Sequence, residues 1–135
     1  MMRSIVSSLG LCFCVLFAVA GAGCSGSEVK PIPQRLVKMG YQLGPSVDIV
    51  RNYSVEGWHA LDDEHVIVET GTATDYLVTL AVDCDGLHAA ETIGFSSTTG
   101  DLTPADDLII HQISANFKCP LKSINTLERQ LTRKP

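Results

Sequence analysis

The fold is decided by the stretch Tyr76–Val82, which reads YLVTLAV and is the strongest β-strand signal in the chain. It is rich in β-branched and aromatic residues, which fit the pleated, half-buried surface of a sheet. A second apolar run, His65–Glu69, precedes it, and the residues between them, from Thr70 to Asp75, favour a turn. Two such runs joined by a short link are typical of an antiparallel hairpin, so the sequence predicts one here.

The residues on either side of this hairpin add further signals. Residues 47–50 favour a strand, Leu87–Ser96 is interpreted mostly as strand, and Leu108–Ile113 is another apolar run. Near the C-terminus, Asn125–Glu128 has the form of a capping box and predicts a short helix that ends at Leu131. The expected fold class is therefore mainly β, with α+β as the alternative: a small antiparallel sheet or partly open barrel of four to five strands with a short C-terminal helix.

The first residues are typical of a secretory signal. Arg3 gives the start one positive charge, Ile5–Ala20 is apolar without a charged residue, and the small residues 21–23 lead to Cys24. This order predicts a signal peptide over residues 1–23. A membrane-spanning helix is the alternative, but the apolar run is shorter than the roughly 20 residues a span needs, and no basic stop follows it.

The residues before Cys24 resemble a bacterial lipobox, in which the cysteine thiol receives a diacylglyceryl group. Gly21 departs from the pattern, since a larger aliphatic residue usually stands there. The alternative is ordinary cleavage after Ala20 or Ala22, which would release a soluble periplasmic protein. We expect lipidation at Cys24, with the membrane as partner through this anchor. By resemblance to lipoproteins of diderm bacteria, Ser25 favours the periplasmic face of the outer membrane.

The cysteine content is compatible with this location. Of five cysteines, Cys12 and Cys14 leave with the signal, and if Cys24 carries lipid, Cys84 and Cys119 remain. Two thiols in an oxidising compartment most simply form one disulfide. Such a bond would close a loop of about 36 residues and stabilise the domain by about 4 kcal/mol.

The remainder of the chain divides into a spacer and one domain. Residues 24–46 are expected to form a flexible tether, because Pro and Gly are frequent and no periodic pattern is present. Residues 47–135 are expected to form a single small β-rich domain. The net charge of the chain is −5, and residues 48–107 carry thirteen acidic residues against one base, Arg51. Because this acidic body would repel phosphates, nucleic acid is not an expected partner.

A pattern of Trp, Cys and apolar residues runs through the domain. A Trp precedes an acidic turn and an apolar strand, a Tyr-Leu strand runs into Cys-x-x-Leu, and a late Cys is followed by Ile and Leu. The residues that carry it are Trp58, Leu61, Asp62, Val66, Ile67, Val68, Tyr76, Leu77, Leu80, Cys84, Leu87, Ile93, residues 107–109, Cys119, Ile124 and Leu127. This pattern resembles a family of small uncharacterised bacterial envelope proteins, a domain of unknown function. Many of its members look like signal-bearing lipoproteins, so the resemblance implies such a protein and no assigned activity.

No catalytic residues are expected. A thiol site would use Cys84 with His88, but Asp83 and Asp85 flank the cysteine, whereas a reactive thiol needs a positive neighbourhood that lowers its pKa. The nucleophile elbow Gly-x-Ser-x-Gly is absent from the sequence. A metal site could draw on an acidic turn, yet no zinc or EF-hand spacing occurs there, so no metal or cofactor is expected. The residues of that turn are His59, Asp62, Asp63, Glu64 and His65.

The functional expectation is a non-enzymatic structural or binding module that acts from a membrane surface. A soluble periplasmic binding or inhibitor protein is the first alternative, and a metal- or thiol-dependent enzyme is the second. Trp58 is the single tryptophan. It is a possible anchor for an envelope protein partner, although core packing is the expected role.

Overall fold

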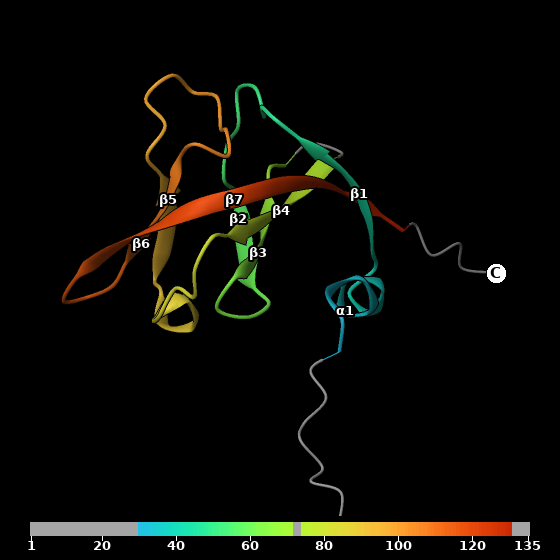
Figure 1. Ribbon diagram of the computed structural model, residues 1–135, viewed down its shortest axis with the longest axis horizontal. Coiled ribbons are helices and arrows are strands. Elements are labelled where there is room, and N and C mark those ends of the chain that lie inside the picture. The colour runs from blue at the N-terminus through green and yellow to red at the C-terminus, as the bar shows by residue number, and fades with distance from the viewer. Residues whose placement is uncertain (1–29, 72–73, 131–135) are drawn as a thin grey trace, which may run out of the picture.

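The computed structural model describes residues 30–71 and 74–130 of the chain (Figure 1). The predicted signal peptide and Cys24 lie outside these residues. No helix within the described ranges is long and apolar enough to cross a membrane. The elements in chain order are α1 (Ile32–Lys38), β1 (Tyr41–Val47), β2 (Gly57–Ala60), β3 (His65–Glu69), β4 (Thr74–Leu80), the 3-10 turn η1 (Leu87–Ala89), β5 (Thr92–Phe95), β6 (Asp107–His111) and β7 (Asn116–Arg129).

The strands of the described chain form one seven-stranded antiparallel sheet in which β7 is the shared partner (Figure 1). The strand order is β2-β3-β4-β7-β6-β5, and β1 also pairs with β7. Residues 121–128 of β7 pair with β4, residues 116–120 with β6, and residues 124–129 with β1. The sheet is open, with β2 and β5 at the ends of the strand order, and does not close into a barrel.

The mainly β fold class and the central hairpin are confirmed. In this hairpin β3 pairs antiparallel with β4, and Val66 lies opposite Val78. The expected number of four to five strands is wrong, because the described residues form seven. The predicted strand over Leu87–Ser96 is half right, since its first part forms the turn η1 and its second part forms β5.

The predicted C-terminal helix is wrong, because Asn125–Glu128 belongs to β7. The buried residues Leu121, Ile124 and Leu127 recur every three positions, a spacing that also suits a helix. In the sheet this spacing has another cause. The register between β4 and β7 shifts at Leu121, so a β-bulge displaces the alternation of faces. Ile124 then packs in one core cluster and Leu127 in the other. Because this part of β7 also pairs with β4 on one edge and with β1 on the other, its tertiary contacts override the local helix signal.

The interpretation of residues 24–46 as a tether is wrong from Ile32 onward, because α1 and β1 are ordered parts of the fold. The Pro and Gly residues that suggested a spacer have specific structural uses. Pro33 lies in the first turn of α1, where its missing N–H has no helical partner to lose. Gly40 follows the helix at φ +83°, a left-handed conformation that suits glycine. Gly44 passes so close to Thr126 that a Cβ atom would lie 2.2 Å from its Oγ1 atom.

Both faces of the sheet are covered at β3 and β4, which explains why β3 is buried at three successive positions. One face of β3 and β4 contributes Val66, Val68 and Val78 to the larger core cluster. The opposite face contributes Ile67 to a smaller cluster, where Leu36 of α1 packs on the sheet. The helix is therefore an integral layer of the domain rather than an appendage.

Candidate functional site

A small cavity lies between the loop after β1 and the start of β4. Its volume is about 50 Å³, and its lining consists of Val50, Arg51, Asn52, Tyr53, Ser54, Thr70 and Tyr76. A volume of this size has room for a few water molecules, whereas sites for small-molecule ligands usually measure about 300–1,000 Å³. The cavity therefore suits ordered water or a small polar group.

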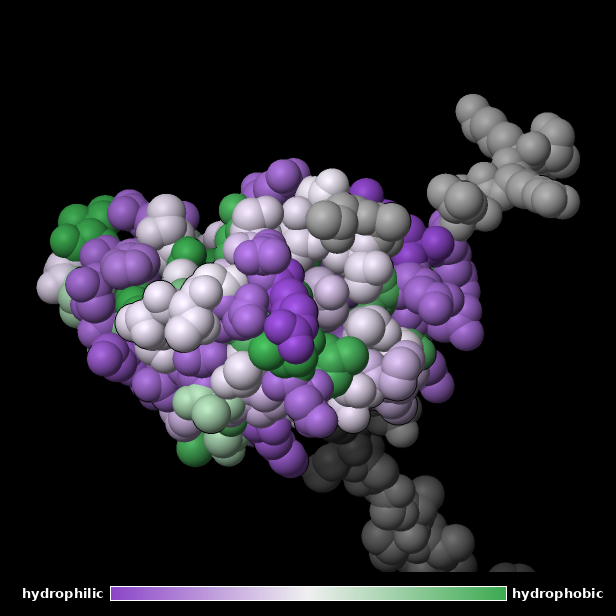
Figure 2. Space-filling model, turned by 90° about the horizontal axis from the view of Figure 1, so that it is seen from above, coloured by the Kyte–Doolittle hydropathy of each residue, from purple (hydrophilic) through white to green (hydrophobic). Residues whose placement is uncertain are grey.

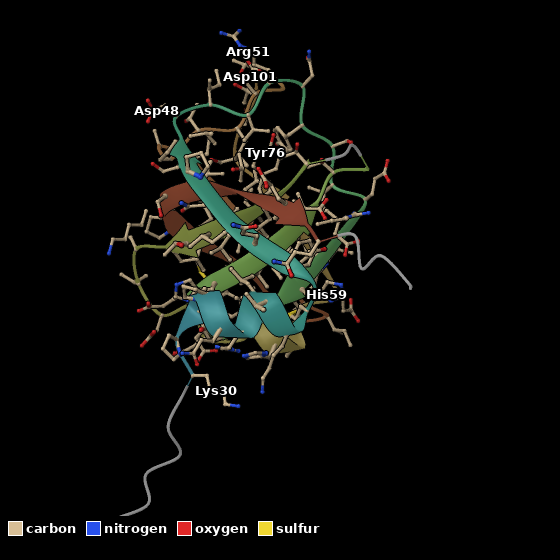
Figure 3. All side chains as sticks on the ribbon, turned by 90° about the vertical axis from the view of Figure 1, so that its right-hand side faces the viewer. Lys30, Asp48, Arg51, His59, Tyr76 and Asp101 are labelled. Carbon is tan, nitrogen blue, oxygen red and sulfur yellow. A yellow bond between two sulfur atoms is a disulfide. The ribbon has the colours of Figure 1, made fainter. Side chains whose placement is uncertain are left out.

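The loop that lines this cavity is held by backbone contacts to a second loop. Val50 and Leu102 form an isolated bridge, and the backbone N–H of Asn52 donates to the Asp101 carboxylate at 2.9 Å. Arg51 and Asp101 lie together at the end of the molecule far from Lys30 (Figure 3). Burial, and secondarily the Asp106 carboxylate, raise the pKa of Tyr53. Both effects disfavour the phenolate, so the hydroxyl of Tyr53 is neutral.

The acidic turn between β2 and β3 is an ion-pair network around Asp62. Its carboxylate accepts from Arg35 of α1 at 3.0 Å and contacts Nδ1 of His65 at 2.7 Å. It also accepts the backbone N–H of Glu64 at 2.9 Å. Burial opposes ionisation, but His65 and the backbone N–H of Glu64 outweigh it and lower the pKa of Asp62. Arg35 also donates to the carbonyl oxygen of Leu61, so the network fastens α1 to the turn.

Other residues that the metal alternative would use belong to separate pairs. His59 lies 3.2 Å from Glu69, and His88 lies 3.6 Å from Asp63. Across the described ranges, no three His, Cys, Asp or Glu side chains gather in a way that could hold a metal ion. The structure thus brings Asp62 and His65 together but does not assemble the full ligand set of the metal hypothesis.

A second charged network, centred on Asp75, was missed by the sequence interpretation, which placed this residue in a turn. Asp75 is fully buried and accepts two hydrogen bonds from Arg129, at 2.8 and 3.2 Å. It also accepts one from the hydroxyl of Tyr41 at 3.0 Å. Burial, followed by the bond to Asp75, raises the pKa of Tyr41, and the same carboxylate raises the pKa of Arg129.

This network joins the first residue of β1, the start of β4 and the last residue of β7. Its carboxylate accepts three hydrogen bonds, and the network connects these chain segments to one another. The available sequence signal was the period of two that places Asp75 on the same face as the buried Leu77. An acid at such a position must have a partner, but the sequence does not show which residue supplies it.

Cys84 and Cys119 form a disulfide, with 6.0 Å between their Cα atoms. Cys84 is 1% exposed and belongs to the larger core cluster, as does Cys119. The bond connects the segment after β4 to the part of β7 that pairs with β6. With Cys84 in this bond, the thiol site predicted as an alternative has no free nucleophile there, and His88 is directed to Asp63 instead.

Trp58 is half-buried and packs against the larger core cluster, in agreement with core packing. It lies opposite Val68 in the pairing of β2 with β3. Figure 2 shows one face of the surface, where hydrophobic residues form small separate groups between polar ones. That face therefore offers no broad apolar area for docking.

The comparisons with known proteins identify the family. A model described as a family of unknown function, DUF6491, matches residues 2–134. The chain belongs to the DUF6491 family. The matched range covers all the described residues of this DUF6491 protein and extends beyond them on both sides. No curated protein and no solved structure matches the chain.

Proposed function

We propose that this DUF6491 protein is an exported bacterial lipoprotein of the cell envelope. It is attached to the outer membrane through Cys24 and acts as a non-enzymatic structural or binding module. The observation that carries the proposal is the Cys84–Cys119 bond in the core. Disulfides form and persist mainly in oxidising compartments such as the periplasm, so the bond supports export independently of the N-terminal signal.

The use made of the charged side chains supports a structural role. In enzymes, ionisable groups with perturbed pKa values commonly line a substrate cleft, where their protonation can change during the reaction. Here Asp62 connects α1 to a turn, and Asp75 connects β1, β4 and β7. The cavity beside Tyr76 holds only about 50 Å³. These features favour action through the surface of the domain, with another envelope protein as the binding partner.

The decisive experiment is the intact mass of the protein isolated from membranes, measured with and without reductant. We expect a chain that lacks residues 1–23, carries an acyl-modified Cys24, and gains the mass of two hydrogens on reduction of Cys84–Cys119. A Cys24→Ser variant is the control and should leave the membrane fraction. An unmodified chain cleaved after Ala20 or Ala22 would refute lipidation and support the soluble periplasmic binder or inhibitor.

Export is tested separately by the state of the remaining thiols. Alkylation of the intact protein before and after denaturation should find no free thiol at Cys84 or Cys119. A free thiol at Cys84 in the protein from cells would contradict residence in an oxidising compartment. It would also reopen the thiol-enzyme alternative, in which His88 is the adjacent base.

A further inference from the structure

The position of α1 in the fold sets a strict limit on how far the domain can lie from its membrane anchor. If the fold began at Val47, the chain from Cys24 could span about 80 Å at roughly 3.5 Å per residue. The structure shows instead that Lys30 lies immediately before the α1 cap at Pro31. Six residue steps separate Cys24 from Lys30, and these reach at most about 21 Å.

This reach is short compared with the dimensions of the membrane surface. The headgroup layer accounts for roughly 5–7 Å on each side of a bilayer, which leaves about 15 Å beyond it. A helix with its side chains is about 10–12 Å in diameter. A lipid on Cys24 therefore holds the start of α1 within little more than one helix diameter of the headgroups, whatever path residues 25–29 take.

The outer side of α1 has the composition of a surface that meets lipid headgroups. Leu36 is fully buried against the sheet, whereas Val37 is 54% exposed and Met39, at the helix end, is 44% exposed. Leu43 of β1 adds a further exposed apolar side chain at 37%. Exposed apolar residues interspersed with basic ones are typical of helices that lie in the interface plane.

The basic residues of this surface are Lys30 and Lys38. Lys30 lies just before the helix cap, Lys38 is the last residue of α1, and both are exposed. Within the described ranges neither amine has an ion pair with a carboxylate, and α1 contains no acidic residue. The nearby acid Asp62 already has Arg35 and His65 as partners. Two exposed cationic side chains on a segment that carries no acid suit the phosphate groups of lipids.

The rest of the molecule extends away from this surface. Figure 3 shows Lys30 below α1 at one end and Asp48 and Asp101 at the other. Figure 1 shows the end of the β6–β7 hairpin far from α1, near the other end of β7. Ile113 in that hairpin turn is 89% exposed and so provides an apolar reference position outside the α1 surface.

We propose that α1 lies on the membrane that anchors Cys24, with Val37 and Met39 among the lipid headgroups and Lys30 and Lys38 against lipid phosphates. This inference rests on the proposed lipoprotein function and adds an orientation to it. The hairpin end and the Asp101 end then face away from the membrane. These are the parts of the domain left free to meet another envelope protein.

The test compares labels at two positions in the acylated protein. Val37→Cys and Ile113→Cys variants are coupled to an environment-sensitive fluorophore, which reacts with the introduced thiol because Cys24 is acylated and Cys84–Cys119 is oxidised. Each is reconstituted into phosphatidylethanolamine–phosphatidylglycerol vesicles with a nitroxide-headgroup lipid as quencher. We expect the Val37 label to be quenched several-fold more strongly than the Ile113 label. A Lys30→Glu/Lys38→Glu variant should lose most of this difference.

The outcomes separate the two proposals. A protein whose mass shows no acyl group refutes the lipoprotein function itself. An acylated protein with equal, weak quenching at Val37 and Ile113 refutes the orientation alone. A spectral shift at Val37 that grows with protein concentration without vesicles would identify a second copy of the chain as the occupant and would also overturn the orientation.

Discussion

The close approach of Gly44 to Thr126 provides the sharpest test of the fold, because it decides whether β1 belongs to the sheet. A Cβ atom at Gly44 would lie 2.2 Å from Thr126 Oγ1, 3.0 Å from its carbonyl oxygen and 3.3 Å from its Cβ atom. Ordinary van der Waals contact begins at about 3.5 Å. Gly44→Ala therefore forces β1 and β7 apart or displaces a side chain between two paired strands.

The expected cost combines two opposing terms. Overpacking by one methyl group costs about 1–3 kcal/mol. Loss of glycine flexibility in the unfolded chain returns about 0.4–1 kcal/mol. The net fall in the free energy of unfolding lies between about 0 and 2.6 kcal/mol, and its midpoint is about 1.3 kcal/mol. A fall of this midpoint size lowers the Tm of a domain of this length by about 5–10 °C. Thermal and urea unfolding can be followed by the fluorescence of Trp58, the single tryptophan.

Gly94→Ala is the matched control. Gly94 also lies in a strand, but a Cβ atom there would meet only His111 Nε2 at 4.0 Å, an ordinary contact. This variant should match or slightly exceed the wild-type Tm. In a Thr126→Ala background the Gly44→Ala penalty should shrink, since the closest clashing atom is removed. A Gly44→Ala variant as stable as Gly94→Ala would refute the pairing of β1 with β7 and restore the tether interpretation.

Three further predictions concern the disulfide, the core and the acidic turn. Replacing Cys84 and Cys119 together by alanine should lower the free energy of unfolding by about 4 kcal/mol, and an unchanged urea midpoint would contradict a stabilising role for the bond. Leu127→Ala should lower the free energy of unfolding by about 2–5 kcal/mol because this side chain is fully buried. Leu43 is 37% exposed, so Leu43→Ala should lower it by less than about 1 kcal/mol. Similar urea midpoints for the two variants would be inconsistent with the burial of Leu127. Because the pKa of Asp62 is lowered from 3.8, its contribution to stability is present above that pH and is lost as the pH falls through the lower folded value. The Asp62→Asn variant should accordingly lose less stability than wild type between neutral and acidic pH. Equal losses in the two proteins would exclude Asp62 as the cause of the acid-induced loss of stability.

The parts of the fold that could be predicted depend on neighbouring residues. The runs His65–Glu69 and Tyr76–Val82 predicted the β3–β4 hairpin because β-branched residues and a short turn act locally. If Cys12 and Cys14 leave with a signal and Cys24 carries lipid, only Cys84 and Cys119 remain. Their bond was therefore predicted from the redox chemistry of that expectation. The network around Asp75 could not be predicted in this way, since its partners Tyr41 and Arg129 lie 34 and 54 residues away in the sequence.

By itself, the sequence determined that the domain is mainly β, that two cysteines are available to pair, and that the N-terminal residues have the pattern of a signal with a lipobox-like end. Only the tertiary structure decided that β1 belongs to the sheet and that the segment around Leu127 is strand rather than helix. Asn125 donates to the carbonyl oxygen of Gly44 across 81 residues of sequence. A segment rich in Gly and Pro has little intrinsic preference for a strand, and the segment around Leu127 has the local features of a helix. Both became strands because each meets a partner edge that only the folded chain brings beside it.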